Sequence, residues 1–185
     1  MENEYKSLRD EIAQYRLINS NIYLANITIT AVLLGYAIKD NPVWYMFLSP
    51  FFIIIPSIIL IATNTSLTAR IGTYILVFIE SNLETLNWET NLQILRGKDL
   101  MKSKKSSFAS SIFLLFILLS GFCLSLCCLY LITKNDINTI SISSISIVLI
   151  SLILAFLQLR KVSKREYIDD YIESWTEVKN DKNKQ

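Results

Sequence analysis

The chain has 185 residues, of which 52% are hydrophobic and 18% are charged, and its formal net charge is +2. An apolar share this large, gathered into long runs, excludes an ordinary soluble domain, and the small net charge without a compact basic patch argues against direct nucleic-acid binding. Four runs reach the length of about 20 mostly apolar residues that a helix needs to cross a bilayer. We therefore predict an all-α integral membrane protein, with four transmembrane helices and amphipathic cytosolic helices that form a small bundle.

The alternation of polar and apolar stretches divides the chain into five predicted segments. They are a cytosolic amphipathic helix (1–17), a first transmembrane hairpin (18–63), a cytosolic helical platform (64–107), a second transmembrane hairpin (108–159), and a cytosolic amphipathic helix with a polar tail (160–185). Because residues 1–16 carry charges of both signs, we expect no cleavable signal peptide.

An apolar stripe marks the amino-terminal helix, where Tyr5, Leu8, Ile12 and Tyr15 recur at steps of three and four residues. The same register continues to Asn19, so we expect this helix to run unbroken into the first span. The stripe packs either against other cytosolic helices of its own subunit or against a neighbouring chain as a short coiled coil. Two heptads are too few for an independent coil, which favours packing within a larger bundle.

The first span, residues 18–38, is uncharged but polar for a membrane helix. Asn19, Asn26 and Thr30 lie on one side of it at helical spacing. Lipid cannot satisfy amide side chains, so this polar stripe is expected to face other helices or water. Hydrogen bonding between helices is the favoured interpretation, and the lining of a pore or cavity is the alternative.

The second span, about residues 44–62, follows a tight turn and contains Pro50 and Pro56, each of which removes a backbone hydrogen bond and can bend a helix. The platform then holds two predicted helices, at about 67–83 and 83–95, with Gly97 ending the second. Glu80 and Glu84 are one turn apart, and we interpret them as solvated helix surface. The residues predicted to form the core of the platform are Arg70, Tyr74, Phe78, Glu80, Trp88 and Glu89.

The third span, about 108–132, contains Gly121 and Ser125, a pair of small residues that would let another helix approach closely. Its three cysteines are interpreted as buried small hydrophobic residues: Cys123, Cys127 and Cys128. The fourth span, about 140–159, ends in a basic cluster. The last amphipathic helix then presents Ile168, Tyr171 and Trp175, which we predict, together with Tyr5, Leu8, Ile12 and Tyr15, to contact a partner or a second subunit.

Orientation follows from the basic residues, because cytosolic loops carry an excess of lysine and arginine. Every lysine and arginine except Lys39 and Lys134 lies in the amino-terminal, platform or carboxy-terminal segment. We therefore predict a multi-pass membrane protein, with the platform and both termini in the cytoplasm.

No arrangement of residues indicates catalysis, and we expect no enzyme activity and no cofactor. Histidine is absent, so the commonest general base and metal ligand is missing. The four glycines are isolated, which excludes a glycine-rich phosphate loop. No aspartate, glutamate, lysine or arginine lies in the middle of a span, and charged residues there are typical of proton relays and coupled transporters.

Three motifs resemble a pattern found in small, uncharacterised bacterial membrane proteins. They are Glu4-Tyr-x-x-Leu-Arg-x-Glu-Ile12, Arg70-Ile-Gly-x-Tyr-Ile-x-x-x-Ile-Glu80, and Trp88-Glu89. The layout of paired spans and amphipathic cytosolic helices is also similar to membrane effectors of bacterial antiviral systems, including the two-span SLATT type, although this chain has a second pair of spans. The resemblance implies a protein of the bacterial plasma (inner) membrane with a role in defence against phage.

Two functions fit these features. We predict a homo-oligomeric component of a defence system, an effector or sensor that forms a pore or perturbs the membrane. The alternative is a non-conducting anchor or scaffold whose cytosolic helices dock a soluble partner protein. The polar stripe favours the first hypothesis, and the three amphipathic segments favour the second.

Overall fold

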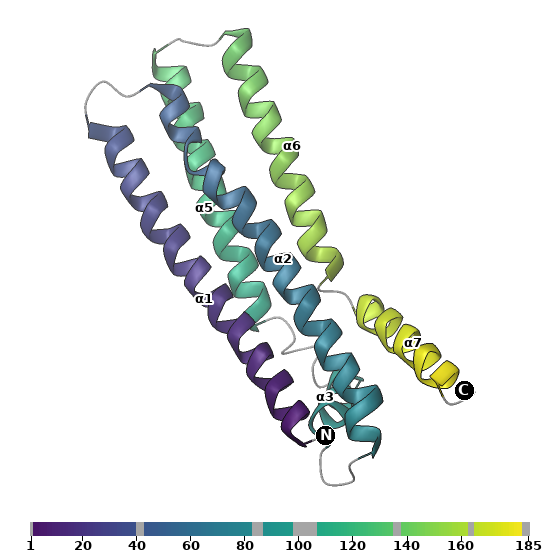
Figure 1. Ribbon diagram of the computed structural model, residues 1–185. Helices are drawn as coiled ribbons and strands as arrows, with labels where there is room; N and C mark the ends of the chain where they lie inside the picture. The colour runs from purple at the N-terminus through teal and green to yellow at the C-terminus, as the bar shows by residue number, and fades with distance from the viewer. Residues whose placement is uncertain are drawn as a thin grey trace. The chain divides into compact units, whose positions relative to one another are not determined.

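The computed structural model describes residues 2–39, 43–82, 87–97, 107–134, 138–162 and 165–182, and every regular element among them is helical (Figure 1). The helices are α1 (Glu2–Lys39), α2 (Phe51–Tyr74), α3 (Trp88–Gly97), α5 (Ser107–Lys134), α6 (Thr139–Val162) and α7 (Arg165–Lys182). Three short segments accompany them: the 3₁₀ segments η1 (Trp44–Leu48) and η3 (Glu80–Asn82), and the π-helical segment η2 (Ile75–Ile79).

Four helical stretches of the described chain are long and apolar enough to cross a membrane. They are Glu2–Lys39, Trp44–Ile79, Leu115–Lys134 and Thr139–Val162. The predicted fold class, an all-helical membrane protein with four candidate spans, is therefore confirmed.

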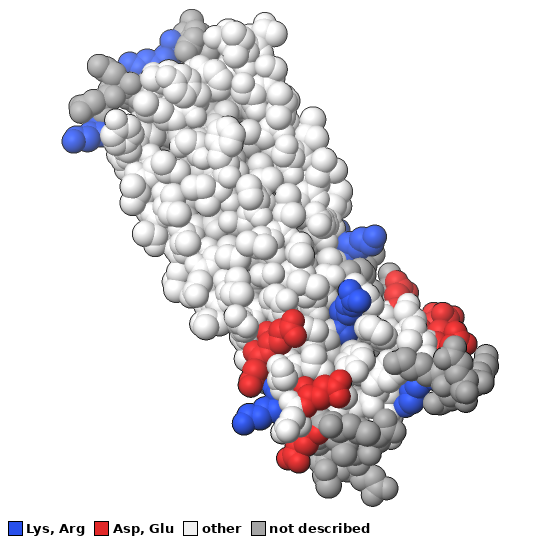
Figure 2. Space-filling view, viewed as in Figure 1, with Lys and Arg blue, Asp and Glu red and all other residues white. Residues whose placement is uncertain are grey.

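The chain divides into two compact units. Unit 1 comprises Met1–Asn19, Ala62–Ser107 and Arg160–Gln185, and unit 2 comprises Ser20–Ile61 and Phe108–Leu159. The sequence of unit 2 has only four charged residues, Lys39, Asp40, Lys134 and Asp136. Figure 2 shows the consequence, because the visible face of unit 2 is mostly white whereas acidic and basic side chains intermingle on unit 1.

Helix α1 is unbroken from Glu2 to Lys39, which confirms that the amino-terminal amphipathic helix continues into the first span. Acidic residues stand in its first turn and a lysine in its last turn. Both placements complement the helix dipole, which favours negative charge at the amino end and positive charge at the carboxyl end. Helix α1 therefore contributes residues to both units.

Helix α2 corrects one expectation, because the separate helices predicted at 44–62 and 67–83 are joined in one helix from Phe51 to Tyr74. The polar residues at 63–68 include neither glycine nor proline, so no helix-breaking residue is present. The Thr68 hydroxyl instead donates a 2.9 Å hydrogen bond to the Asn64 carbonyl of the same helix. Short polar side chains can bond to their own helix in this way without ending it.

The two prolines of the second span have different roles. Pro56 lies inside α2, as expected. Pro50 precedes α2, which is a correction, and its carbonyl accepts the first hydrogen bonds from Ile53 and Ile54, at 3.0 and 2.9 Å. A proline at this position costs no helical bond, because the first amides of a helix have no intrahelical partner.

The core of unit 2 is built from aliphatic and aromatic side chains of its helices. The Tyr23 and Phe116 rings lie 5.6 Å apart, and the Phe47 and Tyr130 rings 5.8 Å apart. Its largest fully buried hydrophobic side chains include Phe51, Phe116, Ile54 and Ile58.

One expectation for α5 needs correction, and a second is not met by contacts within the chain itself. Cys123 and Cys127 are buried as predicted, but Cys128 is exposed, because adjacent positions of a helix point to different sides. Gly121 and Ser125 are also exposed, and nothing lies within 4 Å of a Cβ atom built at Gly121. The close approach predicted for this pair therefore does not occur within the described part of the chain.

Unit 1 has a small apolar core of its own. Ile12 of α1 is buried with Ile75 and Ile79 of η2, and partly buried side chains pack around them, namely Tyr5, Leu8, Ile71 and Tyr74. Three of the four residues of the amino-terminal stripe, Tyr5, Leu8 and Ile12, therefore pack within their own chain. Helix α3 begins at Trp88, later than the predicted start at residue 83, and residues 83–86 lie outside the described range.

Candidate functional site

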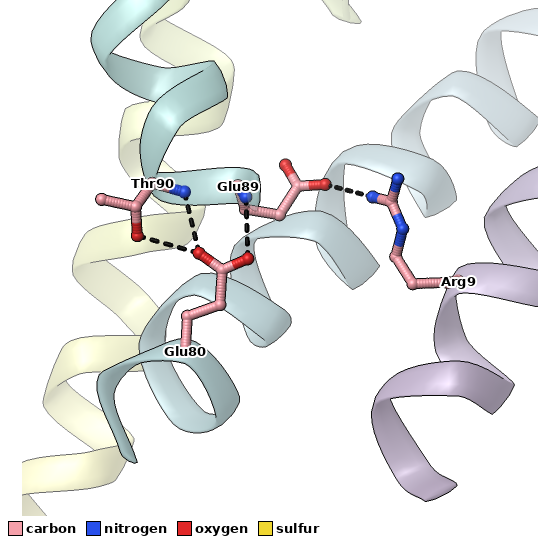
Figure 3. Close-up of polar contacts among 4 residues, drawn as sticks. All are labelled: Arg9, Glu80, Glu89 and Thr90. Atoms are coloured by element: carbon pink, nitrogen blue, oxygen red, sulfur yellow. Dashed lines mark hydrogen bonds and ion pairs between the residues drawn. The ribbon is translucent and has the colours of Figure 1, made fainter. Parts of the chain in front are cut away.

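A buried carboxylate in unit 1 caps the beginning of α3 (Figure 3). Glu80 is 5% exposed, and its two oxygens accept hydrogen bonds from the Glu89 amide at 2.7 Å, the Thr90 amide at 2.8 Å and the Thr90 hydroxyl at 2.8 Å. The first amides of a helix lack intrahelical acceptors, and negative charge is stabilised there. The interpretation of Glu80 as solvated surface is therefore wrong. Glu84 lies outside the described residues.

Glu89, the second residue of α3, joins this helix to the amino-terminal helix α1. The Glu89 carboxylate, itself buried, accepts a 2.7 Å charge-assisted hydrogen bond from the Arg9 guanidinium, which in turn lies 5.3 Å from the centre of the Trp88 ring. Figure 3 shows Arg9, Glu80 and Glu89 converging from α1, η3 and α3. Arg9 thus makes both an ion pair and a cation–π contact with neighbouring residues of one helix turn.

Gly72 provides the space for this ion pair. A Cβ atom built at Gly72 would lie 3.4 Å from one Glu89 carboxylate oxygen and 3.6 Å from the carboxylate carbon. A methyl group is in ordinary contact at that distance, but a larger side chain would compete with the carboxylate for the same volume. The structure therefore gives a physical reason for a small residue two positions after Arg70 in the second motif.

Aromatic side chains connect α2 and η2 to α7. The Trp175 ring lies 5.4 Å from Tyr74 and 5.9 Å from Phe78, both edge-on, and the Arg70 guanidinium lies 5.7 Å from the Trp175 ring centre. The Tyr74 hydroxyl also donates a 2.9 Å hydrogen bond to Glu4. The predicted platform residues Arg70, Tyr74 and Phe78 are thereby brought together with Trp175, and Tyr74 links them to α1.

Lys179 of α7 binds the π-helical segment η2. Its ammonium group donates to the Val77 carbonyl at 2.8 Å and to the Ser81 hydroxyl at 2.6 Å, and the Ser81 hydroxyl donates to the same carbonyl at 2.7 Å. Irregular helical turns change the backbone hydrogen-bonding pattern and so need alternative partners. A lysine donating to this carbonyl ties α7 to the one π-helical segment of the described chain.

The polar stripe of the first span lies inside the protein. Asn26 and Thr30 are each 1% exposed, and the Asn26 amide donates to the Ser57 hydroxyl of α2 at 2.8 Å as well as to the Ile22 carbonyl. Asn19, which belongs to unit 1, accepts a 2.8 Å hydrogen bond from Asn64. Asn26 and Thr30 therefore face the interior of their own chain, whereas Asn19 is half-buried and bonded within unit 1.

The residues predicted to contact a partner lie in different surroundings within unit 1. Tyr5, Leu8 and Ile12 belong to the apolar core of unit 1 and Trp175 to the aromatic cluster. The Tyr171 hydroxyl lies 3.3 Å from that of Ser66. Tyr15 and Ile168 are half-buried.

Sequence reasoning missed several residues of these contacts, among them Ser57, Asn64, Thr90 and Lys179. Asn64 and Ser57 carried a faint signal, since each is a polar residue in or beside a span. Nothing in the sequence distinguishes Lys179 from other surface lysines, because its partners lie about 100 residues earlier in the chain.

The hydrogen bonds and the ion pair of this site join helices of unit 1 to one another. The Glu80 oxygens already accept three donors, which leaves them poorly placed to take a proton from a substrate. Within the described ranges, no group of three or more cysteine, aspartate or glutamate side chains could hold a metal ion. The arrangement can hold α3 and α7 in fixed positions against α1 and α2 within unit 1.

No protein-family model matches the sequence, and neither the curated proteins nor the solved structures yield a match.

Proposed function

We propose that the protein is a membrane-anchored component of a bacterial defence system, in which unit 1 docks a cytosolic partner protein and the spans hold it at the inner membrane. The observation that carries this proposal is the inward direction of the polar stripe. Asn26 and Thr30 are buried in unit 2, and Asn26 is bonded to Ser57. A stripe used for packing within one chain is not available to line a pore.

The construction of unit 1 supports a docking role. Residues of all three sequence motifs meet there, through Arg9, Gly72, Glu80 and Glu89. Buried ion pairs add little net stability, because desolvation offsets much of their attraction, but in some proteins they fix one particular arrangement. A fixed arrangement is what a surface that recognises a partner requires.

The exposed apolar side chains of unit 1 indicate where a partner would bind. Trp88 is 56% exposed on α3, and Ile94 of the same helix and Val178 of α7 are exposed as well. By contrast, Trp175 is packed against Tyr74 and Phe78 within the unit. Exposed aromatic and aliphatic side chains commonly form the centre of a protein interface.

Two features support the cellular context. The layout is similar to membrane effectors of antiviral systems, and the excess of lysine and arginine in unit 1 favours a cytosolic location for that unit. The proposal assigns no catalytic step to the protein itself.

Affinity purification with a matched pair of variants tests the docking function. Ile94→Asp places a charge on the exposed apolar face of α3, while Asn91→Asp adds the same charge one turn away without removing an apolar side chain. We expect a soluble protein retained by the wild type to be lost from the Ile94→Asp variant and kept by the Asn91→Asp variant, at equal membrane abundance. Equal retention by both variants, or retention of no soluble protein by the wild type, would contradict docking.

A second candidate function, an oligomeric pore-forming effector, is favoured by a different observation. Several small or polar residues of the spans point outward: Ser20, Asn21 and Thr28 on α1, and Gly121 and Ser125 on α5. Small residues on a lipid-exposed face allow helices of neighbouring chains to approach closely. Ion flux from liposomes containing the purified protein distinguishes the two functions, since the anchor predicts flux equal to that of protein-free liposomes.

A further inference from the structure

Three buried polar atoms of unit 2 have no hydrogen-bond partner in the described part of the chain. They are the side-chain oxygens of Asn26, Thr30 and Ser120, on residues that are 1%, 1% and 2% exposed. Other span hydroxyls bond to carbonyls of their own helices, as Thr28 does with Leu24 at 2.9 Å and Ser143 with Ile140 at 3.0 Å. Thr30 and Ser120 therefore depart from the usual way in which a hydroxyl is satisfied in a membrane helix.

The register of α1 and α5 brings these atoms to the same level. The two helices contact through the Tyr23 and Phe116 rings, and Figure 1 shows them running in the same direction. Asn26 and Thr30 lie about one and two turns beyond Tyr23, and Ser120 lies about one turn beyond Phe116. Ser120 is therefore expected to lie beside the Asn26–Thr30 side of α1.

Helix α2 contacts the Asn26 side of α1 and so forms a third side of the region between α1 and α5. The Asn26 amide nitrogen already donates to the Ser57 hydroxyl and to the Ile22 carbonyl, both at 2.8 Å, so its two hydrogens are used. Only the Asn26 oxygen remains, as an acceptor, beside two hydroxyls that can each donate and accept. Leaving such groups unsatisfied inside a membrane costs several kcal/mol per group.

We propose that unit 2 contains a buried water site between α1 and α5, formed by the Asn26 side-chain oxygen and the Thr30 and Ser120 hydroxyls. A buried water typically makes about three hydrogen bonds to polar groups that lack other partners, and this set offers that number. Three neutral oxygens are too few for a cation such as calcium, which takes 6–8 oxygen ligands. The site is independent of any role of unit 1.

Substitutions of the two hydroxyls test the site through the sign of their effect on stability. Thr30→Val and Ser120→Ala each remove a hydroxyl at nearly constant shape, and Thr28→Val and Ser143→Ala are the matched controls on exposed positions of the spans. If the hydroxyls hold water, each variant should lower the Tm in detergent by about 2–4 °C, more than its control does. The double variant should lose less than the sum, because both side chains bind the same molecule.

The opposite sign would overturn the proposal. A hydroxyl that is buried without any partner destabilises the fold, so its removal would raise the Tm or leave it unchanged. A crystal structure that resolves internal waters gives a second readout that does not depend on folding of a variant. Density within hydrogen-bonding distance of both hydroxyls is expected, and hydroxyls turned to their own helix carbonyls without such density would exclude the site.

Discussion

At the scale of single residues, Glu80 determines where α3 begins. Its carboxylate accepts the amides of Glu89 and Thr90, nine and ten residues later in the chain, and the Thr90 hydroxyl in addition. A capping side chain usually stands immediately before its helix, in the N-cap position. Here the cap comes from η3, so the start of α3 depends on the end of the α2–η2–η3 segment.

A single-atom change at Glu80 should loosen α3. Glu80→Gln replaces one carboxylate oxygen with a donor, which then faces an amide or hydroxyl donor of α3, and we expect a loss of roughly 1–3 kcal/mol. Hydrogen exchange measured by mass spectrometry should accelerate in peptides covering residues 88–97, with Glu173→Gln on an exposed face of α7 as the control. Unchanged exchange in α3 would show that the carboxylate does not hold this helix.

These residue contacts were the part least accessible to sequence reasoning. Arg9 and Glu89 are 80 residues apart, and neither periodicity nor composition links them. The sequence allowed two interpretations of Glu80, solvated helix surface or platform core, and the three-dimensional structure shows that it is buried. The three sequence motifs contain most of the residues involved, but they do not indicate which side chains contact one another.

At the scale of elements, the attachment of α7 to η2 is the most informative contact of unit 1. Lys179 reaches the Val77 carbonyl and the Ser81 hydroxyl, at the π-helical turn that separates α2 from η3. The turn also carries Ile75 and Ile79, which are buried against Ile12. Segment η2 therefore contributes to the apolar core, binds α7 and leads directly into η3, which begins with Glu80.

Removal of the Lys179 charge should release α7 while leaving the spans intact. Lys179→Met keeps a long apolar stem but loses both donors, and a hydrogen bond from a charged group contributes about 1.5–3 kcal/mol. We expect hydrogen exchange in residues 165–182 to rise by roughly tenfold or more, because local opening becomes easier by that amount. Glu177→Gln, an exposed neighbour, should have little effect. Identical exchange in the two variants would contradict this role.

The elements themselves were predictable in part. Long apolar runs and the continuous register of the amino-terminal stripe correctly predicted the four candidate spans and the unbroken α1. The predicted break between the helices at 44–62 and 67–83 was wrong. The residues between them are polar, but none of them is a glycine or a proline that would end a helix. Polarity reports on the surroundings of a helix, whereas glycine, proline and capping residues report on its ends.

At the scale of the whole molecule, charge is separated by unit. Unit 2 is uncharged apart from residues 39, 40, 134 and 136, whereas unit 1 holds nearly all the ionisable residues and has its own apolar core. The burial of charge in hydrocarbon is costly, so this separation fits a chain whose unit 2 lies in lipid and whose unit 1 lies in water. The basic residues of unit 1 predict that this water is the cytoplasm.

Cysteine labelling of intact spheroplasts tests this arrangement most directly. In a background with Cys123, Cys127 and Cys128 replaced by alanine, single variants Asn41→Cys and Asn135→Cys would report on the two predicted turns, which lie outside the described residues, and Glu177→Cys on unit 1. We predict that a membrane-impermeant maleimide labels positions 41 and 135 from outside and labels position 177 only after lysis. Protection of either turn until lysis, or labelling of position 177 in intact spheroplasts, would contradict the proposed topology.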